Sequence, residues 1–284
     1  MAHGSVAVPY CWDQCFVPHG TGAVGCVGWI TVGSPTVSDL EAIIDRLQWS
    51  WDHLQRFKLI LVEQGVGYHW TPLPKVKTES YCYIDFVIDE VTPLPDHLKF
   101  IIGDCIHSLR ASLDNLIYLL CPTDYAEFPI CKTSNQWESN ARKIKALPED
   151  PAKVLYDLQP FHPKNGVDPE WNPLWVLDRL WNDDKHRAPH MALGVTDTAT
   201  IEFGIGGGDF IWFVMNTGPL DLGSKICRVW APIDSEPDLV PHFAFEVAFD
   251  DFGPARGGSV YYSLVNLHQR VAEVVERFRP FFTG

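Results

Sequence analysis

Residues 96–121 have the sequence D-H-L-K-F-I-I-G-D-C-I-H-S-L-R-A-S-L-D-N-L-I-Y-L-L-C. This segment predicts one long amphipathic helix, on which the rest of the fold prediction depends. Pro122 follows it and stops the helix. Its apolar positions recur at helical spacing: Leu98, Ile102, Cys105, Leu109, Leu113, Leu116 and Leu120. A polar stripe of His107, Arg110 and Asp114 falls at i, i+3 and i+7, where an ordinary solvent face would carry Lys and Glu. This stripe is the first candidate site.

Other segments with helical spacing surround this one. The run 38–65 begins at Ser38, where S-D-L-E is typical of a capping box, and ends at Gly65. A third helix is expected from about Pro173 to Arg187 and a fourth from about Ser259 to Phe278. Shorter helices are expected near 135–146 and 150–158.

Strand patterns appear in two places. Residues 81–91 alternate, with Cys82, Ile84, Phe86 and Ile88 on one face and Tyr83, Asp85 and Asp89 on the other. After residue 190 the chain is rich in Val, Ile, Phe and Trp between turn residues, which predicts strands over 198–205, 209–216, 225–230 and 242–250. The G-I-G-G-G run at 204–208 is interpreted as a hairpin connection, because strand-like sequence follows it rather than a helix.

These elements predict an α+β fold: a helical bundle with an inserted strand or hairpin, then an antiparallel β layer and a closing C-terminal helix. The closing helix is expected to pack on the helical layer or to cover the sheet. The expected divisions are an atypical N-terminal extension (1–37), the bundle (38–190) and the β layer with its helix (191–284).

Composition excludes several classes of protein. The chain has 284 residues, 46% of them hydrophobic, so it can bury a real core. It shows no apolar run long enough for a membrane span and no signal-peptide pattern, and we expect a cytoplasmic protein with reduced thiols. The net charge of −14 argues against nucleic-acid binding through the overall field. Residues 188–252 contribute −8 of it, so a local basic site elsewhere stays compatible with RNA.

The first 35 residues differ from the rest, with Asp13 their one charged residue. They read as a loosely ordered arm or as sequence translated from an early start codon. A zinc knuckle is the alternative, with the ligands Cys11, Cys15, His19 and Cys26. Their spacing matches none of the usual close pairs.

The tail of the helix 173–187 carries a second polar group. Arg179, Asn182 and His186 repeat the i, i+3, i+7 spacing, and Lys185 and Arg187 add positive charge. Asp184 projects nearer the apolar side and needs a partner, for which Arg110 is the expected residue.

Three interpretations of the two polar groups stay open. They form a buried network that fixes helix register, with His107, Arg110, Asp114 and Asp184 as members. Alternatively, they form a groove in which an imidazole moves a proton while arginines hold a phosphate. A metal site would draw on His107, Asp183, Asp184, His186 and His190, although Pro189 separates the two later histidines. No metal or other cofactor is predicted.

The motif pair resembles a family of uncharacterised bacterial proteins. The run at 103–116 and the W-N-D-D-K-H-R at 181–187 are similar to its G-D-x-x-H-x-L-R-x-x-L-D and N-x-D-K-H-R motifs, with F-P-I (128–130) and L-Q-P (158–160) between them. The similarity covers roughly residues 38–282 and implies no particular activity.

The helical part is similar in style to the HEPN superfamily, many of whose members are metal-independent ribonucleases of toxin–antitoxin and phage-defence systems. Their R-x4-6-H motif would map onto Arg179 and His186, although the residue after the Arg, usually polar, is Leu180 here. The resemblance implies that the RNA 2′-hydroxyl attacks its own phosphate while His186 moves the proton and Arg179 stabilises charge. It also implies a homodimer.

Three functions therefore stand as hypotheses. The first is a cytoplasmic metal-independent ribonuclease that uses Arg179, Asn182 and His186. The second is a non-catalytic binding protein, whose acidic β layer recognises a partner protein and whose polar cluster is structural. The third is a metal-dependent helical-bundle enzyme that uses His107 and His186.

Overall fold

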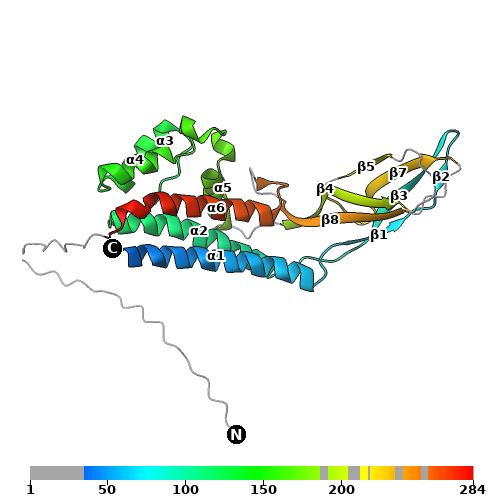
Figure 1. Ribbon diagram of the computed structural model, residues 1–284, viewed down its shortest axis with the longest axis horizontal. Coiled ribbons are helices and arrows are strands. Elements are labelled where there is room, and N and C mark those ends of the chain that lie inside the picture. Colours follow the sequence, from blue (N-terminus) through cyan, green and yellow to red (C-terminus); the bar gives the residue numbers. More distant parts are fainter. Residues whose placement is uncertain are drawn as a thin grey trace, which may run out of the picture. The chain divides into compact units, whose positions relative to one another are not determined.

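The computed structural model describes residues 35–185, 191–203, 212–216, 218–233, 239–250 and 255–283. These residues form helices and antiparallel sheets (Figure 1), which confirms the α+β prediction. The α-helices are α1 (Val37–Glu63), α2 (Leu98–Leu120), α3 (Ser134–Asn140), α4 (Glu149–Asp157), α5 (Pro173–Asp184) and α6 (Val260–Phe278). Short 3-10 turns lie at Ala141–Ile144, Pro163–Asn165, Pro169–Trp171 and Arg279–Phe281.

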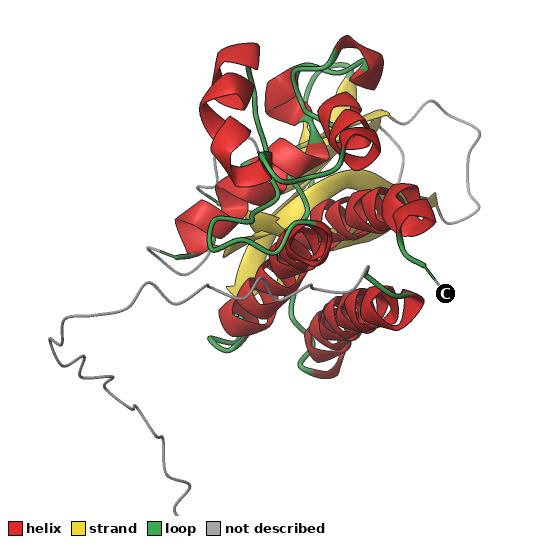
Figure 2. Cartoon of the chain, turned by 90° about the vertical axis from the view of Figure 1, so that its left-hand side faces the viewer, coloured by secondary structure: helices red, strands yellow, loops and turns green. Residues whose placement is uncertain are grey.

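The long helices pack on one another. Helix α1 packs against α2 and α6, and α2 also contacts α5 and α6. Figure 2 views the chain from its helical end, with helices lying in front of the strands. The closing helix α6 thus packs on the helical layer, which was one of the two positions expected for it. Its apolar face is buried there: Leu264, Leu267, Val271, Val274 and Val275.

Helix α1 begins slightly earlier than predicted, and its capping residue is a different one. Thr36, not Ser38, is the N-cap: its side chain accepts from the Asp39 amide, and the Asp39 carboxylate accepts from the Thr36 amide at 2.8 Å. The S-D-L-E motif that begins at Ser38 has the residue types of a capping box, but the observed cap lies two positions earlier, at Thr36. The helix ends near Gly65, as predicted, where φ is +58° and glycine is favoured.

The strands form two antiparallel sheets within the described residues. They are β1 (Tyr68–Pro72), β2 (Val76–Lys77), β3 (Tyr81–Val91), β4 (Met191–Phe203), β5 (Trp212–Met215), β6 (Gly218–Pro219), β7 (Lys225–Pro232) and β8 (Leu239–Phe249). One sheet has the order β1-β3-β7-β5, with β2 paired to β3, and the other has the order β6-β4-β8. Strand β3 therefore pairs with a strand that comes more than 130 residues later, Ile84 opposite Val229. The inserted strand and part of the later β segment share one sheet.

The predicted strand bounds hold well where side chains alternate. Strand β3 has the predicted limits, while β4 begins at Met191, earlier than the predicted 198. The G-I-G-G-G run lies outside the described residues. Asp85, predicted for the solvent face of β3, is buried, because the Arg228 and Lys225 side chains of β7 pair with it at 2.6 and 2.7 Å.

No helix in the described part of the chain is long and apolar enough to span a membrane.

Candidate functional site

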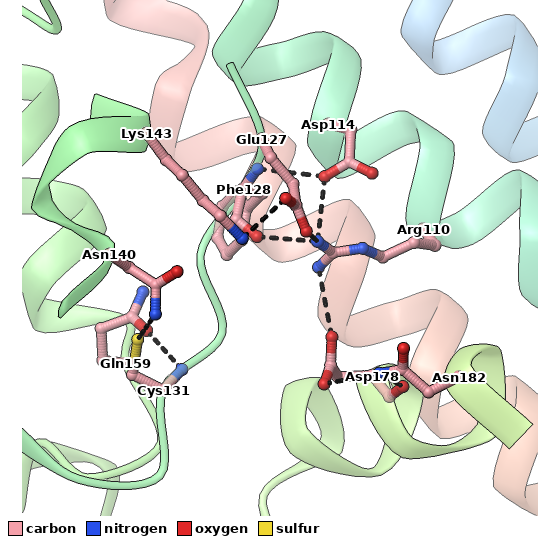
Figure 3. Close-up of polar contacts among 10 residues, drawn as sticks. All are labelled: Arg110, Asp114, Glu127, Phe128, Cys131, Asn140, Lys143, Gln159, Asp178 and Asn182. Carbon is pink, nitrogen blue, oxygen red and sulfur yellow. Dashed lines mark hydrogen bonds and ion pairs between the residues drawn. The ribbon is translucent and has the colours of Figure 1, made fainter. Parts of the chain in front are cut away.

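Arg110 is the centre of the polar group on α2. Helix geometry places it one turn before Asp114, and its side chain is 1% exposed although it carries a full charge. Its Nη2 atom donates to Glu127 Oε1 at 2.7 Å and to the Phe128 carbonyl at 3.0 Å (Figure 3). Asp114 Oδ1 lies 3.1 Å from Nη2 and also accepts from the Phe128 amide. Arg110 thereby joins α2 to the segment that follows it.

Helix α5 closes the other side of this arginine. Asp178 Oδ1 lies 3.8 Å from Arg110 Nη1, and the guanidinium lies 5.0 Å from the centre of the Trp181 ring. Lys143 pairs with the outer oxygen of Glu127 at 2.7 Å. We call the set the Arg110 cluster; its members are Arg110, Asp114, Glu127, Lys143 and Asp178 (Figure 3).

Burial shapes the electrostatics of this cluster. It raises the pKa of Asp114 and of Asp178, and the attraction of Arg110 only partly opposes the effect. Burial acts in the same direction on Glu127, but Lys143 and Arg110 together hold the pKa of that carboxyl below its usual range. Three carboxylates thus compete for one buried guanidinium.

Hydrogen bonds to the Arg110 guanidinium are unevenly distributed over its nitrogen atoms. Among the described residues, the buried Nε and Nη1 atoms of Arg110 have no hydrogen-bond acceptor. Its attachment therefore rests on Nη2, on the longer ion pair with Asp178 and on the Trp181 ring. Packing and charge, rather than a complete set of hydrogen bonds, keep it in place.

Three members of the cluster, Asp114, Glu127 and Lys143, border a hollow at the surface. This polar hollow has a volume of about 340 Å³ and is lined by Asp114, Asp124, Tyr125, Ala126, Glu127, Arg142 and Lys143. Arg142 stacks over the Tyr125 ring at 4.6 Å, and Lys143 is held by Glu127. Both basic groups are thus engaged with residues of the protein.

Asp184 does not have the predicted partner. The α5 carboxylate that faces Arg110 is Asp178, and Asp184 lies one and a half turns further along, against Gly103. Burial raises the pKa of Asp184, while His107 attracts its charge and Asp104 repels it. The spacing along α5 identified an inward carboxylate correctly but paired it with the wrong residue of α2.

The three polar residues of the α2 stripe separate into two environments. Arg110 and Asp114 belong to the Arg110 cluster, whereas the His107 side chain is exposed, near Asp184. Lys185 lies over the Trp181 ring. Sequence spacing grouped these residues on one stripe, but the packing of α5 covers only part of it.

Of the predicted catalytic residues, the structure describes Arg179 and Asn182. Arg179 is 49% exposed and lies 3.8 Å from Asp183 on its own helix. The Asn182 amide donates to the backbone and the carboxylate of Asp178, at 2.8 and 3.1 Å. His186 and Arg187 lie outside the described residues, so the geometry of an Arg179/His186 pair stays a prediction.

Metal ligands do not gather in the described part of the chain: no three His, Cys, Asp or Glu side chains there could hold an ion together. His190 and the four ligands proposed for a zinc knuckle lie outside the described residues.

Three members of the Arg110 cluster were not predicted from the sequence: Glu127, Lys143 and Asp178. A usable signal was present for one, because Glu127 directly precedes the F-P-I run at 128–130. Lys143 lies within the helical segment predicted near 135–146, but that pattern does not indicate that its side chain pairs with Glu127.

No family model, curated protein or solved structure matches the chain. The resemblance to uncharacterised bacterial proteins and to HEPN domains therefore stays a prediction.

Proposed function

We propose that this protein is a non-catalytic binding protein and that the Arg110 cluster is structural. One observation carries the proposal: the guanidinium of Arg110 is 1% exposed and enclosed by carboxylates, a carbonyl and an indole ring. A catalytic arginine must reach a substrate oxygen, and Arg110 is already occupied by the protein. Arg179, the arginine of the ribonuclease hypothesis, is 49% exposed, and the RNA assay below tests it directly. Its contacts join α2, α5 and the segment at 127–128, which is the arrangement expected of a residue that fixes helix register.

The pairing of charges in the cluster decides how much stability the loss of Arg110 would cost. A buried ion pair adds little net stability over apolar residues of similar volume, but removal of one partner leaves an uncompensated buried charge. In this cluster, loss of Arg110 would leave Asp114, Glu127 and Asp178 without their buried cation. Among the described residues, Lys143 forms a direct ion pair with Glu127 and acts on Asp114 and Asp178 only from a greater distance.

We also propose that the protein is located in the cytoplasm. The side chains of Cys105, Cys121, Cys131 and Cys227 are free thiols, and a reducing compartment preserves such thiols. We propose that the acidic residues of segment 188–252, which carries −8 of the net charge, attract a partner protein with a basic surface.

The ribonuclease hypothesis, with its RNA and homodimer partners, is the competing function, and one assay separates the two. Wild type, His186→Ala and Arg179→Ala are incubated with total RNA in EDTA. A binding protein leaves the RNA intact in all three samples, or with the same trace degradation in all three. Cleavage by wild type that both variants lose would overturn the proposal.

A further inference from the structure

An apolar pocket opens where the end of α1, the start of α6 and strand β8 meet. Its volume is about 480 Å³, within the range of small-molecule sites. Phe57 and Val247 form buried parts of its wall, at 1% and 3% exposure. The remaining apolar lining is Leu61, Val62, Val66, Tyr261 and Tyr262. The pocket lies apart from the Arg110 cluster and shares no residue with it.

Val62 and Tyr262 leave much of this lining open to water, at 72% and 63% exposure. Large apolar side chains that border a cavity and remain exposed are typical of surfaces that bind something. Gly65, just past the end of α1, lines the same pocket and adds no side chain to fill it.

Positive charge borders the pocket on one side. The Lys58 ammonium lies 5.1 Å from the centre of the Tyr261 ring, which holds the cation at the pocket wall. Among the described residues no carboxylate pairs with Lys58. A ligand carboxylate would supply the missing partner, and the long apolar stem of Lys58 would extend the apolar wall.

The start of α6 adds to this charge. Ser259 caps the helix by accepting from the Tyr262 amide, and Ser259, Tyr261 and Tyr262 all line the pocket. The positive end of the α6 dipole therefore faces the same space as Lys58.

Glu246 is the acidic residue of the lining. It lines the pocket together with its neighbour on β8, Val247. Within the described residues no ion pair joins Glu246 to Lys58, so the Lys58 ammonium stays available to a ligand carboxylate.

We propose that this pocket binds an apolar molecule that ends in a carboxylate, with Lys58 as the residue that holds the carboxylate. The apolar body would lie against Phe57, Val247 and the tyrosine rings. The proposal rests on the proposed binding function and names the class of its ligand.

Calorimetric titration with dodecanoate, kept below its micelle concentration, tests this inference. We expect one molecule to bind per chain, and we expect dodecanol and dodecyltrimethylammonium to bind at least tenfold more weakly. Lys58→Met keeps an apolar stem of similar length and removes the charge, so it should weaken dodecanoate binding at least tenfold. Lys58→Arg should retain most of the affinity.

The matched control is Lys153→Met, because Lys153 is an exposed lysine on α4 outside the pocket lining. It should bind dodecanoate like wild type, and thermal melts should show that all variants fold. Absence of binding, equal binding by Lys58→Met, or tighter binding of the cationic probe would each overturn the assignment. The RNA assay uses other residues, so failure of the pocket and failure of the proposed function are distinguishable.

Discussion

The Nη1 atom of Arg110 lies 3.8 Å from Oδ1 of Asp178, so an ion pair links α2 to α5 through two side chains 68 positions apart in the sequence. The same guanidinium binds Glu127 and the Phe128 carbonyl through Nη2. Asp178 is therefore the more dispensable partner, and its removal leaves Arg110 attached.

Asp178→Asn should change stability in a pH-dependent way. Burial raises the pKa of Asp178, so the native protein holds this proton more tightly than the unfolded chain does. Wild type must lose stability as pH rises from the unfolded value of 3.8 through the raised native value. The Asp178→Asn variant lacks this loss. Its free energy of unfolding should therefore rise relative to that of wild type, by about 1.4 kcal/mol for each pH unit between the unfolded and the native pKa.

Urea unfolding at a series of pH values from 3 to 8 measures this gain. Asp45→Asn, which removes a carboxylate at an exposed position of α1 far from the cluster, is the control. A variant that loses stability relative to wild type as pH rises would refute the assignment of Asp178 as a carboxylate whose burial outweighs its ion pair.

Asp85→Asn should behave in the opposite sense. Hydrogen bonds from Arg228 hold the pKa of Asp85 below its usual range, although burial opposes them. The charged pair therefore stabilises the fold above the unfolded pKa, and that contribution disappears as pH falls through the lowered native value. We expect a loss of about 2 kcal/mol at pH 7 that shrinks in acid.

The same unfolding series reports this effect, with Asp45→Asn again as the exposed reference. A difference between Asp85→Asn and wild type that stays equal from pH 7 down to pH 2 would show that the ion pair of β3 with β7 does not stabilise the protein.

Gly103→Ala tests the contact of α2 with Asp184. In an ordinary helix interior this change stabilises by about 1 kcal/mol. Here the added methyl would lie 3.0 Å from Asp184 Oδ1, so the gain should be reduced or reversed. In an Asp184→Ala background the contact is gone, and the full gain should appear. Equal effects of Gly103→Ala in the two backgrounds, measured by chemical unfolding, would contradict the packing described for α5.

Much of the fold followed from local pattern. The helices α2 and α6 and the strand β3 were predictable because their apolar side chains keep a clear period over ten or more residues. The pairing of β3 with β7 was not, because alternation shows that a strand has a buried face but not which strand lies beside it. The helix cap at Thr36 was missed because Thr36 and Ser38 both offer a capping side chain with an acid three residues later.

The site was predictable only in part for a similar reason. Arg110 and Asp114 lie on one helix, so spacing brought them together. Asp178 and Glu127 come from other segments, and only the angle at which α5 packs on α2 decides that Asp178, rather than Asp184, faces the arginine. One-dimensional spacing contains no information on that angle.

The free energy of unfolding of Arg110→Ala at pH 7 tests the central claim most directly. A structural cluster predicts a loss of about 3–5 kcal/mol, because three carboxylates lose their buried cation. Arg110→Lys, which keeps the charge but not the planar fork, should lose less, and Arg56→Ala, at an exposed position of α1, should stay within about 0.5 kcal/mol of wild type. An Arg110→Ala protein as stable as Arg56→Ala would contradict the structural role of the cluster.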